Sequence, residues 1–321
     1  MLENRWPNLK IAALIPCLNE EAAISDVIND VRKYLPEAKI YVYDNASNDK
    51  TEEKALLAGA TVRHEPRRGK GNVVCRMFAD IEADIYFMTD GDLTYDLSQI
   101  AEHIQMILKK NVDMLVGERK TLEKNSYRFG HRQGNRLFNW ATNFLYKSDL
   151  RDIFSGYRVM TRRFVKTFPS VAKGFEIETE LSVHALDLRL EIIETPVTYG
   201  SRPTGSASKL NTIRDGIKIA IMLTLLFKET APLKFFGIGT FVFFILSLLL
   251  SYPLVINFIE TGLVERLPTA VLCSGLIILS SVSLICGLVL DSVAKGRKEL
   301  KRLHFLMYSS LKWLDFKNEI Y

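Results

Sequence analysis

The chain has 321 residues, of which 48% are hydrophobic and 25% are charged, and this balance excludes a disordered or low-complexity protein. A net charge of +5 is too small to indicate nucleic-acid binding. The four cysteines are scattered without CxxC or Cys/His ligand spacing, which argues against a zinc site and a disulfide framework, and we expect a reducing compartment. We expect no cleavable signal peptide, because the first ten residues carry no apolar stretch.

Residues 1–210 alternate between buried-strand patterns and amphipathic helical patterns. The patterns predict strands over 10–16, 39–43, 61–64, 85–88 and 113–116, and helices over 20–34, 51–58, 71–83 and 98–109. Strands that alternate with helices predict a mostly parallel sheet with helices on both faces. In such sheets ligands bind beyond the carboxyl ends of the strands, so the residues that follow each strand are the candidates for a site.

Polar residues follow three of these strands. Asn19 and Glu20 come after the first strand, Asp44 after the second, and Asp90 and Asp92 after the fourth. Two carboxylates one residue apart can bind one Mg²⁺ or Mn²⁺ ion, although Asp-Gly after a strand is also typical of a simple turn. Asp44 can accept a hydrogen bond from a ribose or a base. The alternative for its loop is the N-cap of the next helix, at residue 47 or 48.

The loop 67–71 (RRGKG) is basic and rich in glycine, and it precedes a predicted helix. Such a loop can approach a phosphate closely, and the alternative is an ordinary solvated loop. No GxGxxG sequence follows the first strand and the chain contains no Walker A sequence. The dinucleotide-binding and P-loop interpretations are therefore poor.

Two uncharged runs, 235–259 and 267–290, are each longer than the roughly 20 residues that span a bilayer core. Buried core helices are the alternative, which two adjacent uncharged runs of this length disfavour. Five Lys and Arg residues follow the second run between 295 and 302, whereas the connector holds one Arg and two Glu. The positive-inside rule then predicts that both flanks are cytoplasmic. Residues 211–227 read as an amphipathic helix, either at the membrane interface or packed on the soluble domain.

Six motifs occur in order along the chain: IPCLNEE (15–21), YDNASNDKT (43–51), RRGKGN (67–72), TDGDLTYD (89–96), VGER (116–119) and DIFSGYRVMTR (152–162). With these motifs, residues 10–210 resemble glycosyltransferase family 2, which has the GT-A fold. Within that family the chain resembles the polyprenyl-phosphate sugar transferases, including dolichyl-phosphate mannose synthases. The C-terminal hairpin is similar to that of the bacterial enzymes with two transmembrane helices.

The resemblance implies four parts. They are a cytoplasmic GT-A catalytic domain (1–210), an amphipathic juxtamembrane helix (211–232), two transmembrane helices (233–290) and a cytoplasmic basic tail (291–321). It places the protein in the inner (cytoplasmic) membrane as a multi-pass protein, with a homotetramer as the implied assembly.

The resemblance also assigns roles to residues by position. It implies a nucleotide pocket formed by Pro16, Asn19, Glu20, Asp44, Lys70 and Asp90. It implies a metal site, for Mg²⁺ or Mn²⁺, at Asp90 and Asp92. The implied catalytic groups are Asp152, as an acidic group on the acceptor side, and Asp92. It implies an acceptor-phosphate site among Arg119, Arg128, Arg202 and Lys209.

The activity implied by the resemblance is an inverting, metal-dependent sugar transfer. The donor is a nucleotide-diphosphate sugar, a UDP-sugar in the bacterial branch, and the acceptor is polyprenyl (undecaprenyl) phosphate. Two alternatives stay open at this point. One is a processive polysaccharide synthase, which normally needs a longer membrane part. The other is a membrane-anchored nucleotide-sugar-binding protein without catalysis.

The chain departs from the family pattern at two positions. Asn45 stands where many members have a second Asp, and Thr94 stands where the dolichyl-type enzymes have Gln, which leaves the third metal ligand open. The sequence QGNRL at 133–137 is similar to the QxxRW motif of processive synthases but lacks Trp, so it predicts an ordinary helix face. We expect a structural or solvated role for all five histidines, His64, His103, His131, His184 and His304.

Overall fold

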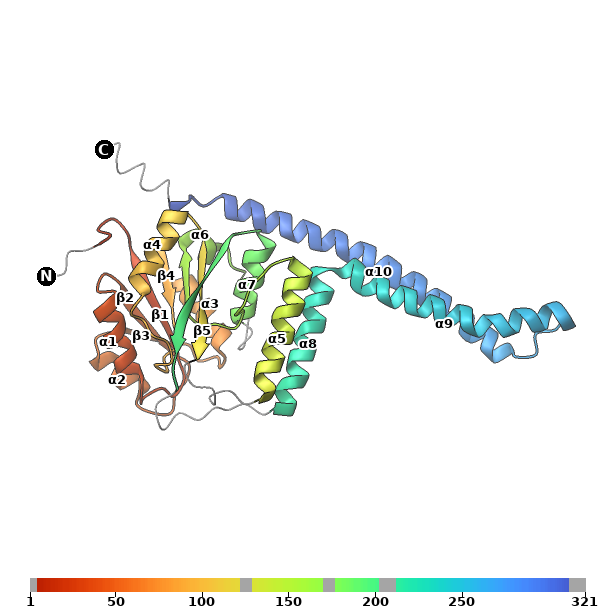
Figure 1. Cartoon of the computed structure of the whole chain (residues 1–321), viewed down its shortest axis with the longest axis horizontal. Coiled ribbons are helices and arrows are strands. Elements are labelled where there is room, and N and C mark those ends of the chain that lie inside the picture. Colours follow the sequence, from red (N-terminus) through yellow and green to blue (C-terminus); the bar gives the residue numbers. More distant parts are fainter. Residues whose placement is uncertain (1–4, 122–128, 170–176, 202–211, 312–321) are drawn as a thin grey trace. The chain divides into compact units, whose positions relative to one another are not determined.

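The computed structural model describes residues 5–121, 129–169, 177–201 and 212–311 (Figure 1). The chain divides into two compact units. The first comprises Met1–Thr212 with Lys301–Tyr321, and the second comprises Ile213–Leu300. The candidate site residues that the structure describes all belong to the first unit.

A seven-stranded sheet forms the centre of the first unit, in the order β3-β2-β1-β4-β6-β5-β7. Strand β6 runs antiparallel to its neighbours β4 and β5, and the other neighbouring pairs are parallel. The mostly parallel sheet expected from the sequence is therefore confirmed. The strands are β1 (Ile11–Cys17), β2 (Lys39–Asp44), β3 (Thr61–His64), β4 (Ile85–Met88), β5 (Met114–Thr121), β6 (Arg158–Thr161) and β7 (Ile192–Tyr199).

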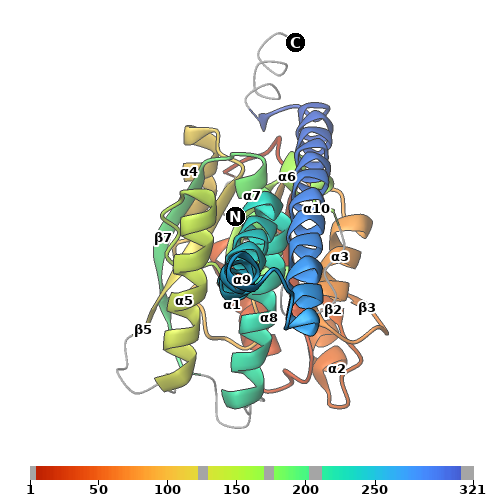
Figure 2. The same cartoon turned by 90° about the vertical axis from the view of Figure 1, so that its right-hand side faces the viewer.

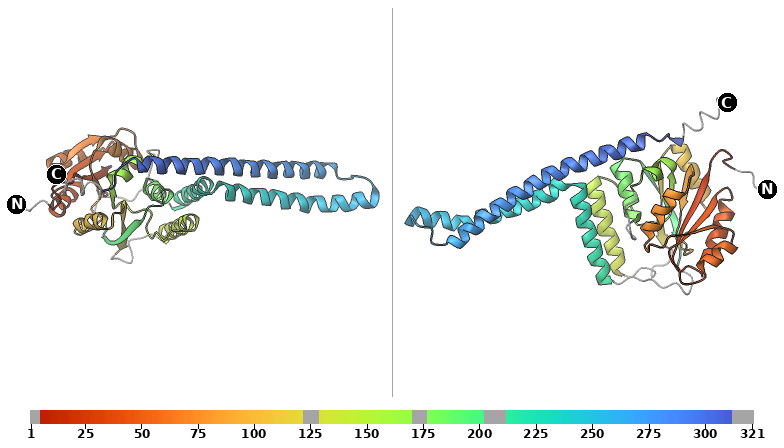
Figure 3. Two further views of the ribbon diagram at one scale, coloured as in Figure 1. Left: turned by 90° about the horizontal axis from the view of Figure 1, so that it is seen from above. Right: turned by 180° about the vertical axis from the view of Figure 1, so that it is seen from behind.

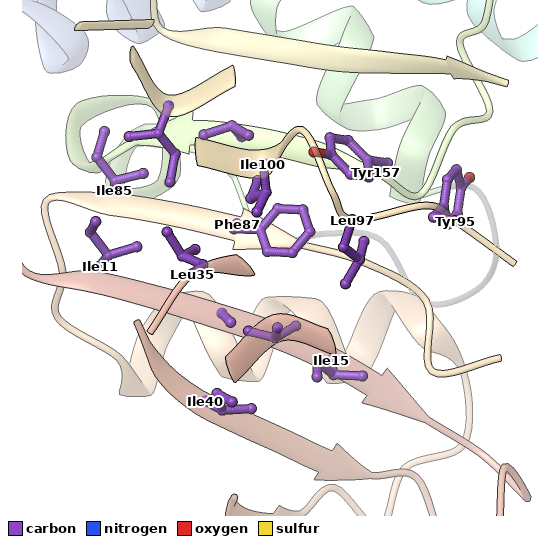
Figure 4. Close-up of a cluster of buried hydrophobic side chains, with 14 of the residues drawn as sticks. Ile11, Ile15, Leu35, Ile40, Ile85, Phe87, Tyr95, Leu97, Ile100 and Tyr157 are labelled. Carbon is purple, nitrogen blue, oxygen red and sulfur yellow. The ribbon is translucent and has the colours of Figure 1, made fainter. Parts of the chain in front are cut away.

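Two hydrophobic clusters cover the two faces of the sheet, because successive side chains of a strand point to opposite faces. Ile15 packs in the first cluster and Leu14 in the second, and β1 is buried at every residue. Figure 4 shows the first cluster, in which the rings of Phe87 and Tyr157 meet edge to face at 5.0 Å. The helices of this unit are α1 (Ile24–Tyr34), α2 (Thr51–Leu57), α3 (Lys70–Asp80), α4 (Ile100–Lys110), α5 (Phe129–Tyr146), α6 (Arg162–Thr167) and α7 (Ile177–Asp187).

Several element boundaries differ from the sequence prediction. Helix α1 starts at Ile24 rather than at residue 20, because residues 21–23 form a turn. The N-cap of α2 is Lys50, not residue 47 or 48, and the Oδ1 atom of Asp49 accepts a hydrogen bond from the Thr51 amide at 3.0 Å. The motif at 133–137 lies within helix α5, as predicted.

The second unit contains α8 (Thr212–Thr230), α9 (Pro232–Thr261) and most of α10 (Leu267–Leu306). Helices α9 and α10 lie side by side as a hairpin (Figure 3). Hydroxyl groups connect them: Ser283 Oγ donates to the Phe236 carbonyl at 2.8 Å, and Ser280 Oγ donates to the Thr240 carbonyl at 3.0 Å. Both helices are long and apolar enough to cross a membrane. Hydrogen bonds of this kind are typical of helix pairs in lipid.

The end of α10 belongs to the first unit. Lys301 forms an ion pair with Asp187 at 2.9 Å, and Arg302 donates to the Leu188 carbonyl at 3.0 Å. Phe305 is buried, and the Arg163 guanidinium of α6 lies 4.7 Å from its ring centre. Figure 2 shows this end of α10 beside α6. We refer to residues 301–311 as the C-terminal segment. It packs on the first unit.

Candidate active site

The loops after β1 and β2 hold each other in place at the carboxyl ends of these strands. Pro16 is buried within β1, opposite Tyr43 of β2. Asn19 has a left-handed backbone (φ 55°), and its Oδ1 atom accepts a hydrogen bond from the Asn48 amide at 2.8 Å. The Glu20 amide donates to Thr51 Oγ1 at 2.9 Å. These residues shape the loops that border Asp44.

Asp44 is buried at the end of β2, beside the last residue of β1. Its Oδ2 atom accepts a hydrogen bond from the Ser47 amide at 3.0 Å and lies 3.6 Å from His64 Nδ1. Its Oδ1 atom is also buried and has no hydrogen-bond partner within the described part of the chain. Since an unsatisfied buried acceptor is costly, this oxygen is a candidate to receive a donor group of a ligand.

Asn45 fixes the loop that leads into α3. Its amide nitrogen donates to the carbonyls of Glu65 and Arg67 at 2.9 and 2.8 Å, and its Oδ1 atom accepts from the Gly69 amide at 2.7 Å. Gly69 has φ 128°, a conformation that favours glycine. An aspartate at position 45 would lack both donors, which gives a physical reason for Asn here. The consequence is a fixed position for Lys70, the first residue of α3.

Lys70 lies between two carboxylates. Its Nζ atom donates to Asp90 Oδ1 and to Glu178 Oε1, each at 2.5 Å. Burial lowers the pKa of Lys70, but the two neighbouring carboxylates raise it more, so the net pKa is raised and the ammonium stays charged. Glu178 belongs to α7, and sequence reasoning missed it, because 108 residues separate it from Lys70.

Asp90 and Asp92 lie in different surroundings. Asp90 is partly exposed, whereas Asp92 is only 3% exposed. The Oδ1 atom of Asp92 accepts hydrogen bonds from the amide and the hydroxyl of Thr94, at 3.3 and 2.6 Å. Gly156 packs on Asp90 so closely that a Cβ atom there would lie 2.5 Å from Asp90 Oδ2. The SGYR motif thus meets the DGD motif.

These carboxylates suit a hard divalent ion, because oxygen ligands are the ones that Mg²⁺ and Mn²⁺ prefer. In the described ranges, however, no three His, Cys, Asp or Glu side chains come together to hold a metal ion. Beside the two carboxylates found in these ranges, water or the oxygens of a bound diphosphate can complete the ligands of such an ion.

Asp152 and Arg119 form a bidentate ion pair. The guanidinium of Arg119 donates to both carboxylate oxygens at 2.7 Å, and the Arg119 amide donates to Asp152 Oδ2 at 3.1 Å. Parallel hydrogen bonds of this type are among the strong ones in proteins. The Arg119 guanidinium also lies 5.6 Å from the ring centre of Tyr199. The structure therefore brings together the candidate catalytic acid and one candidate phosphate ligand.

Glu194 of β7 holds the segment that carries Asp152. Its Oε1 atom accepts from the amides of Arg151 and Asp152 at 2.9 and 3.0 Å. Burial raises the pKa of Glu194, and the two amide donors oppose this. Sequence reasoning missed Glu194, because a glutamate in an alternating strand is typical of a solvent-facing position.

Arg158 connects the same segment to α7. Its buried guanidinium donates to the carbonyls of Ile153 and Glu178 at 2.7 and 2.8 Å, and to Ser182 Oγ at 2.9 Å. Burial lowers the pKa of Arg158 to about 10, so it remains charged at neutral pH. One cation thereby ties together the Asp152 segment and the start of α7, where Glu178 lies.

The remaining candidates lie elsewhere or outside the described residues. Arg128, Arg202 and Lys209 fall in the ranges 122–128 and 202–211, which the structure does not describe, as is also the case for the His131 side chain. His103 is buried and its Nδ1 atom lies 2.7 Å from the Tyr157 hydroxyl. His184 is buried, His64 is exposed, and the ring of His304 meets that of Tyr308 at 5.6 Å.

Comparison with known proteins gives the family. The model of glycosyl transferase family 2 matches residues 12–168. Protein RfbJ of Shigella flexneri is 52% identical over 128 residues, which cover 40% of this chain and 99% of that protein. Glycosyltransferase AglJ of Haloferax volcanii is 36% identical over 229 residues, which cover 71% of this chain and 75% of that protein. The chain belongs to glycosyl transferase family 2 and is a glycosyltransferase.

A more distant relative is a dolichyl-phosphate hexose transferase of Haloferax volcanii, 24% identical over 209 residues, covering 65% of this chain and 90% of that protein. Among solved structures, glucosyl-3-phosphoglycerate synthase from Mycobacterium tuberculosis, in complex with Mn²⁺, UDP and glucosyl-3-phosphoglycerate, aligns with a TM-score of 0.55 and 21% identity. The alignment covers 70% of this chain and 80% of that one. This likeness confirms the GT-A fold.

Proposed function

We propose that this glycosyltransferase moves a sugar from a nucleotide-diphosphate sugar, a UDP-sugar, to polyprenyl (undecaprenyl) phosphate at the cytoplasmic face of the inner membrane. The proposal is supported chiefly by the part of the chain that follows the catalytic fold. It contains two helices of 30 and 40 residues, each long and apolar enough to cross a membrane. A transferase that is anchored by such helices is suited to an acceptor whose tail stays in the bilayer.

The donor side of the site offers groups that suit a nucleoside diphosphate. Asp44 presents a buried carboxylate oxygen at a strand end, where a ribose or base can donate to it. Lys70 supplies a cation close to Asp90. The choice of UDP and of a divalent ion is supported by the solved relative, which binds UDP and Mn²⁺. Mg²⁺ or Mn²⁺ held by Asp90 and Asp92 would neutralise charge on the leaving diphosphate.

The acceptor side offers Arg119. A guanidinium binds a phosphate through two parallel hydrogen bonds, and Arg119 already makes this kind of contact with Asp152. In the proposed step a phosphate oxygen of the lipid attacks the anomeric carbon as the bond to the nucleoside diphosphate breaks, with inversion. The lipid phosphate is anionic at neutral pH, so it needs no strong general base. Asp152 then orients Arg119, and Glu194 holds Asp152.

Exposed apolar side chains on one face of α5 support a position of the catalytic unit close to a membrane. Leu137, Trp140 and Phe144 lie on one face of this helix and are exposed, Trp140 at 64% and Phe144 at 68%. The two aromatic rings stack with their centres 5.8 Å apart. Tryptophan is enriched where protein meets the membrane interface. The Lys and Arg residues that flank the hairpin support the proposed cytoplasmic orientation, and a homotetramer stays a prediction.

The test is a transfer assay with the purified full chain in detergent. A radiolabelled UDP-sugar is supplied with undecaprenyl phosphate, and the products are separated into lipid, polymer and free sugar. We expect the label in a monoglycosylated lipid. Label in long polymer would support a processive synthase instead, and no transfer with any nucleotide sugar would leave a binding protein.

A further inference from the structure

We propose that the Lys70 ammonium neutralises Asp90 as long as no donor is bound. A divalent metal ion then binds tightly only together with the donor diphosphate. This inference rests on the proposed metal-dependent function. It assigns to Lys70 a role in the order of binding, in addition to its predicted approach to the nucleotide.

The ammonium group of Lys70 lies against a carboxylate that the metal ion would also need. Lys70 Nζ contacts Asp90 Oδ1 and Glu178 Oε1, and the three residues come from α3, the loop after β4 and α7. Asp90 is also one of the two carboxylates proposed to hold the metal ion. A divalent ion that approaches this carboxylate therefore meets a positive charge that is already hydrogen-bonded to it, and like charges at such a separation repel strongly in a partly buried site.

Asp90 has little room to bind both the Lys70 ammonium and a metal ion. Its Oδ1 atom accepts from Lys70, while its Oδ2 atom packs against the backbone of Gly156. Asp92 Oδ1 accepts two hydrogen bonds from Thr94. Within the residues that the structure describes, no third metal-binding side chain joins them. An ion without diphosphate would have to compete with Lys70 for few ligands.

The donor diphosphate removes both obstacles. Its oxygens add ligands to the ion, and its negative charge gives Lys70 a new partner. The flexible four-carbon side chain lets the ammonium turn from Asp90 to a phosphate, while Glu178 still pairs with it. Metal and nucleotide then each raise the affinity of the other by the same factor, as linkage requires.

The test is a titration of the full chain with Mn²⁺ in detergent, followed by electron paramagnetic resonance of the free ion, with and without UDP. For the unaltered protein we expect UDP to tighten Mn²⁺ binding by about tenfold or more, a typical size for coupled sites. For Lys70→Met we expect Mn²⁺ alone to bind about tenfold tighter and most of the UDP effect to disappear.

Lys166→Met is the matched control, because it also removes a shielded ammonium. The Lys166 side chain is 11% exposed, close to the 13% of Lys70, and it pairs with Glu82 away from the site. We expect Mn²⁺ affinity to be unchanged in this variant. Lys70→Gln, which keeps a hydrogen-bonding group, carries the same expectation as Lys70→Met if the methionine variant does not fold.

Equal Mn²⁺ affinity in the unaltered protein and in the Lys70 variants would overturn the inference, as would a gain of the same size in Lys166→Met. The titration needs no lipid acceptor. Failure to glycosylate polyprenyl phosphate would therefore overturn the proposed function and leave this result intact. A chain that binds no Mn²⁺ with UDP in any variant would overturn the inference and the metal dependence together.

Discussion

The guanidinium of Arg119 holds both carboxylate oxygens of Asp152, each at 2.7 Å. Parallel charge-assisted hydrogen bonds of this kind fix the orientation of both side chains. We therefore expect Asp152 to orient Arg119 towards the acceptor phosphate rather than to remove a proton. The distinction matters, because the two roles predict different kinetics.

Arg119→Ala should raise the KM for polyprenyl phosphate by about 10- to 100-fold, the size of a lost charge-assisted hydrogen-bond pair, and leave the KM for the nucleotide sugar unchanged. Arg119→Lys should also be impaired, because an ammonium cannot reproduce the planar fork. Asp152→Asn should show the same pattern with an unaltered acid limb of the pH–rate profile. A loss of that limb would instead identify Asp152 as a general base.

Asp90→Asn and Asp92→Asn should each reduce transfer to near background, because each removes one of two carboxylates proposed to hold the metal ion. Asparagine keeps a side-chain oxygen that can accept from Thr94, so we expect Asp92→Asn to fold. The measurements are transfer rate and melting temperature, with chelator-treated protein as reference. Full activity of either variant in the presence of chelator would contradict the metal assignment.

His184 should make the catalytic unit sensitive to acid. Burial, and secondly the charge of Lys301, lower its pKa to about 3, so the folded protein keeps it neutral. An unfolded chain protonates this histidine below about pH 6.5. The contribution of the neutral His184 to the free energy of unfolding is thus fully present above pH 6.5. It is lost as the pH falls towards 3, and the loss is about 2 kcal/mol at pH 5.

The measurement for His184 is thermal unfolding at pH 7 and pH 5 in the unaltered chain and in His184→Gln. The variant has no titrating group at this position, so its melting temperature should fall less between the two pH values. An equal fall in both proteins would contradict a buried neutral histidine as the source of the acid sensitivity.

The C-terminal segment should stabilise the catalytic unit. Phe305 is 3% exposed and lies under the Arg163 guanidinium, so Phe305→Ala should cost about 3 kcal/mol of unfolding free energy. Leu303→Ala is the control on the same helix, because Leu303 is 62% exposed and should cost little. Chemical denaturation of both variants decides between them. Similar losses would show that the segment does not contribute through Phe305.

The hairpin should place both of its flanks in the cytoplasm. A reporter fused to the C-terminus should read cytoplasmic, and one inserted at Gly262, in the turn after α9, should read external. The opposite labelling would deny the catalytic unit access to cytosolic nucleotide sugars.

Two of the strands that the sequence predicted, β1 and β4, carry uninterrupted apolar runs. Strands β1 and β4 are buried at every residue, so each gives a continuous hydrophobic signal. Strand β6 is equally buried but starts with Arg158, whose charge is satisfied by carbonyls and a hydroxyl from other parts of the chain. The local sequence does not reveal such partners, because an arginine interrupts the apolar pattern of a strand whether it is buried or exposed.

The presence or absence of a local sequence signal also explains which site residues the sequence predicted. Asp44, Asp90 and Asp92 follow strands, and the chemistry of strand ends identifies them. Glu178 lies in helix α7 and Glu194 lies within strand β7. Their partners, Lys70 and the Asp152 amide, are distant in sequence, so no local pattern identifies these two glutamates. The sequence thus predicted the carboxylates at the strand ends. It did not predict the ion pairs, which depend on how α7 and β7 meet the rest of the fold.

The proposed function is tested most directly by transfer of labelled sugar from UDP-sugar to undecaprenyl phosphate by the full chain, compared with Arg119→Ala at limiting and saturating lipid. We expect a monoglycosylated lipid product, with the variant impaired chiefly at limiting lipid. A labelled polymer, or a variant equally impaired at both lipid concentrations, would contradict this expectation.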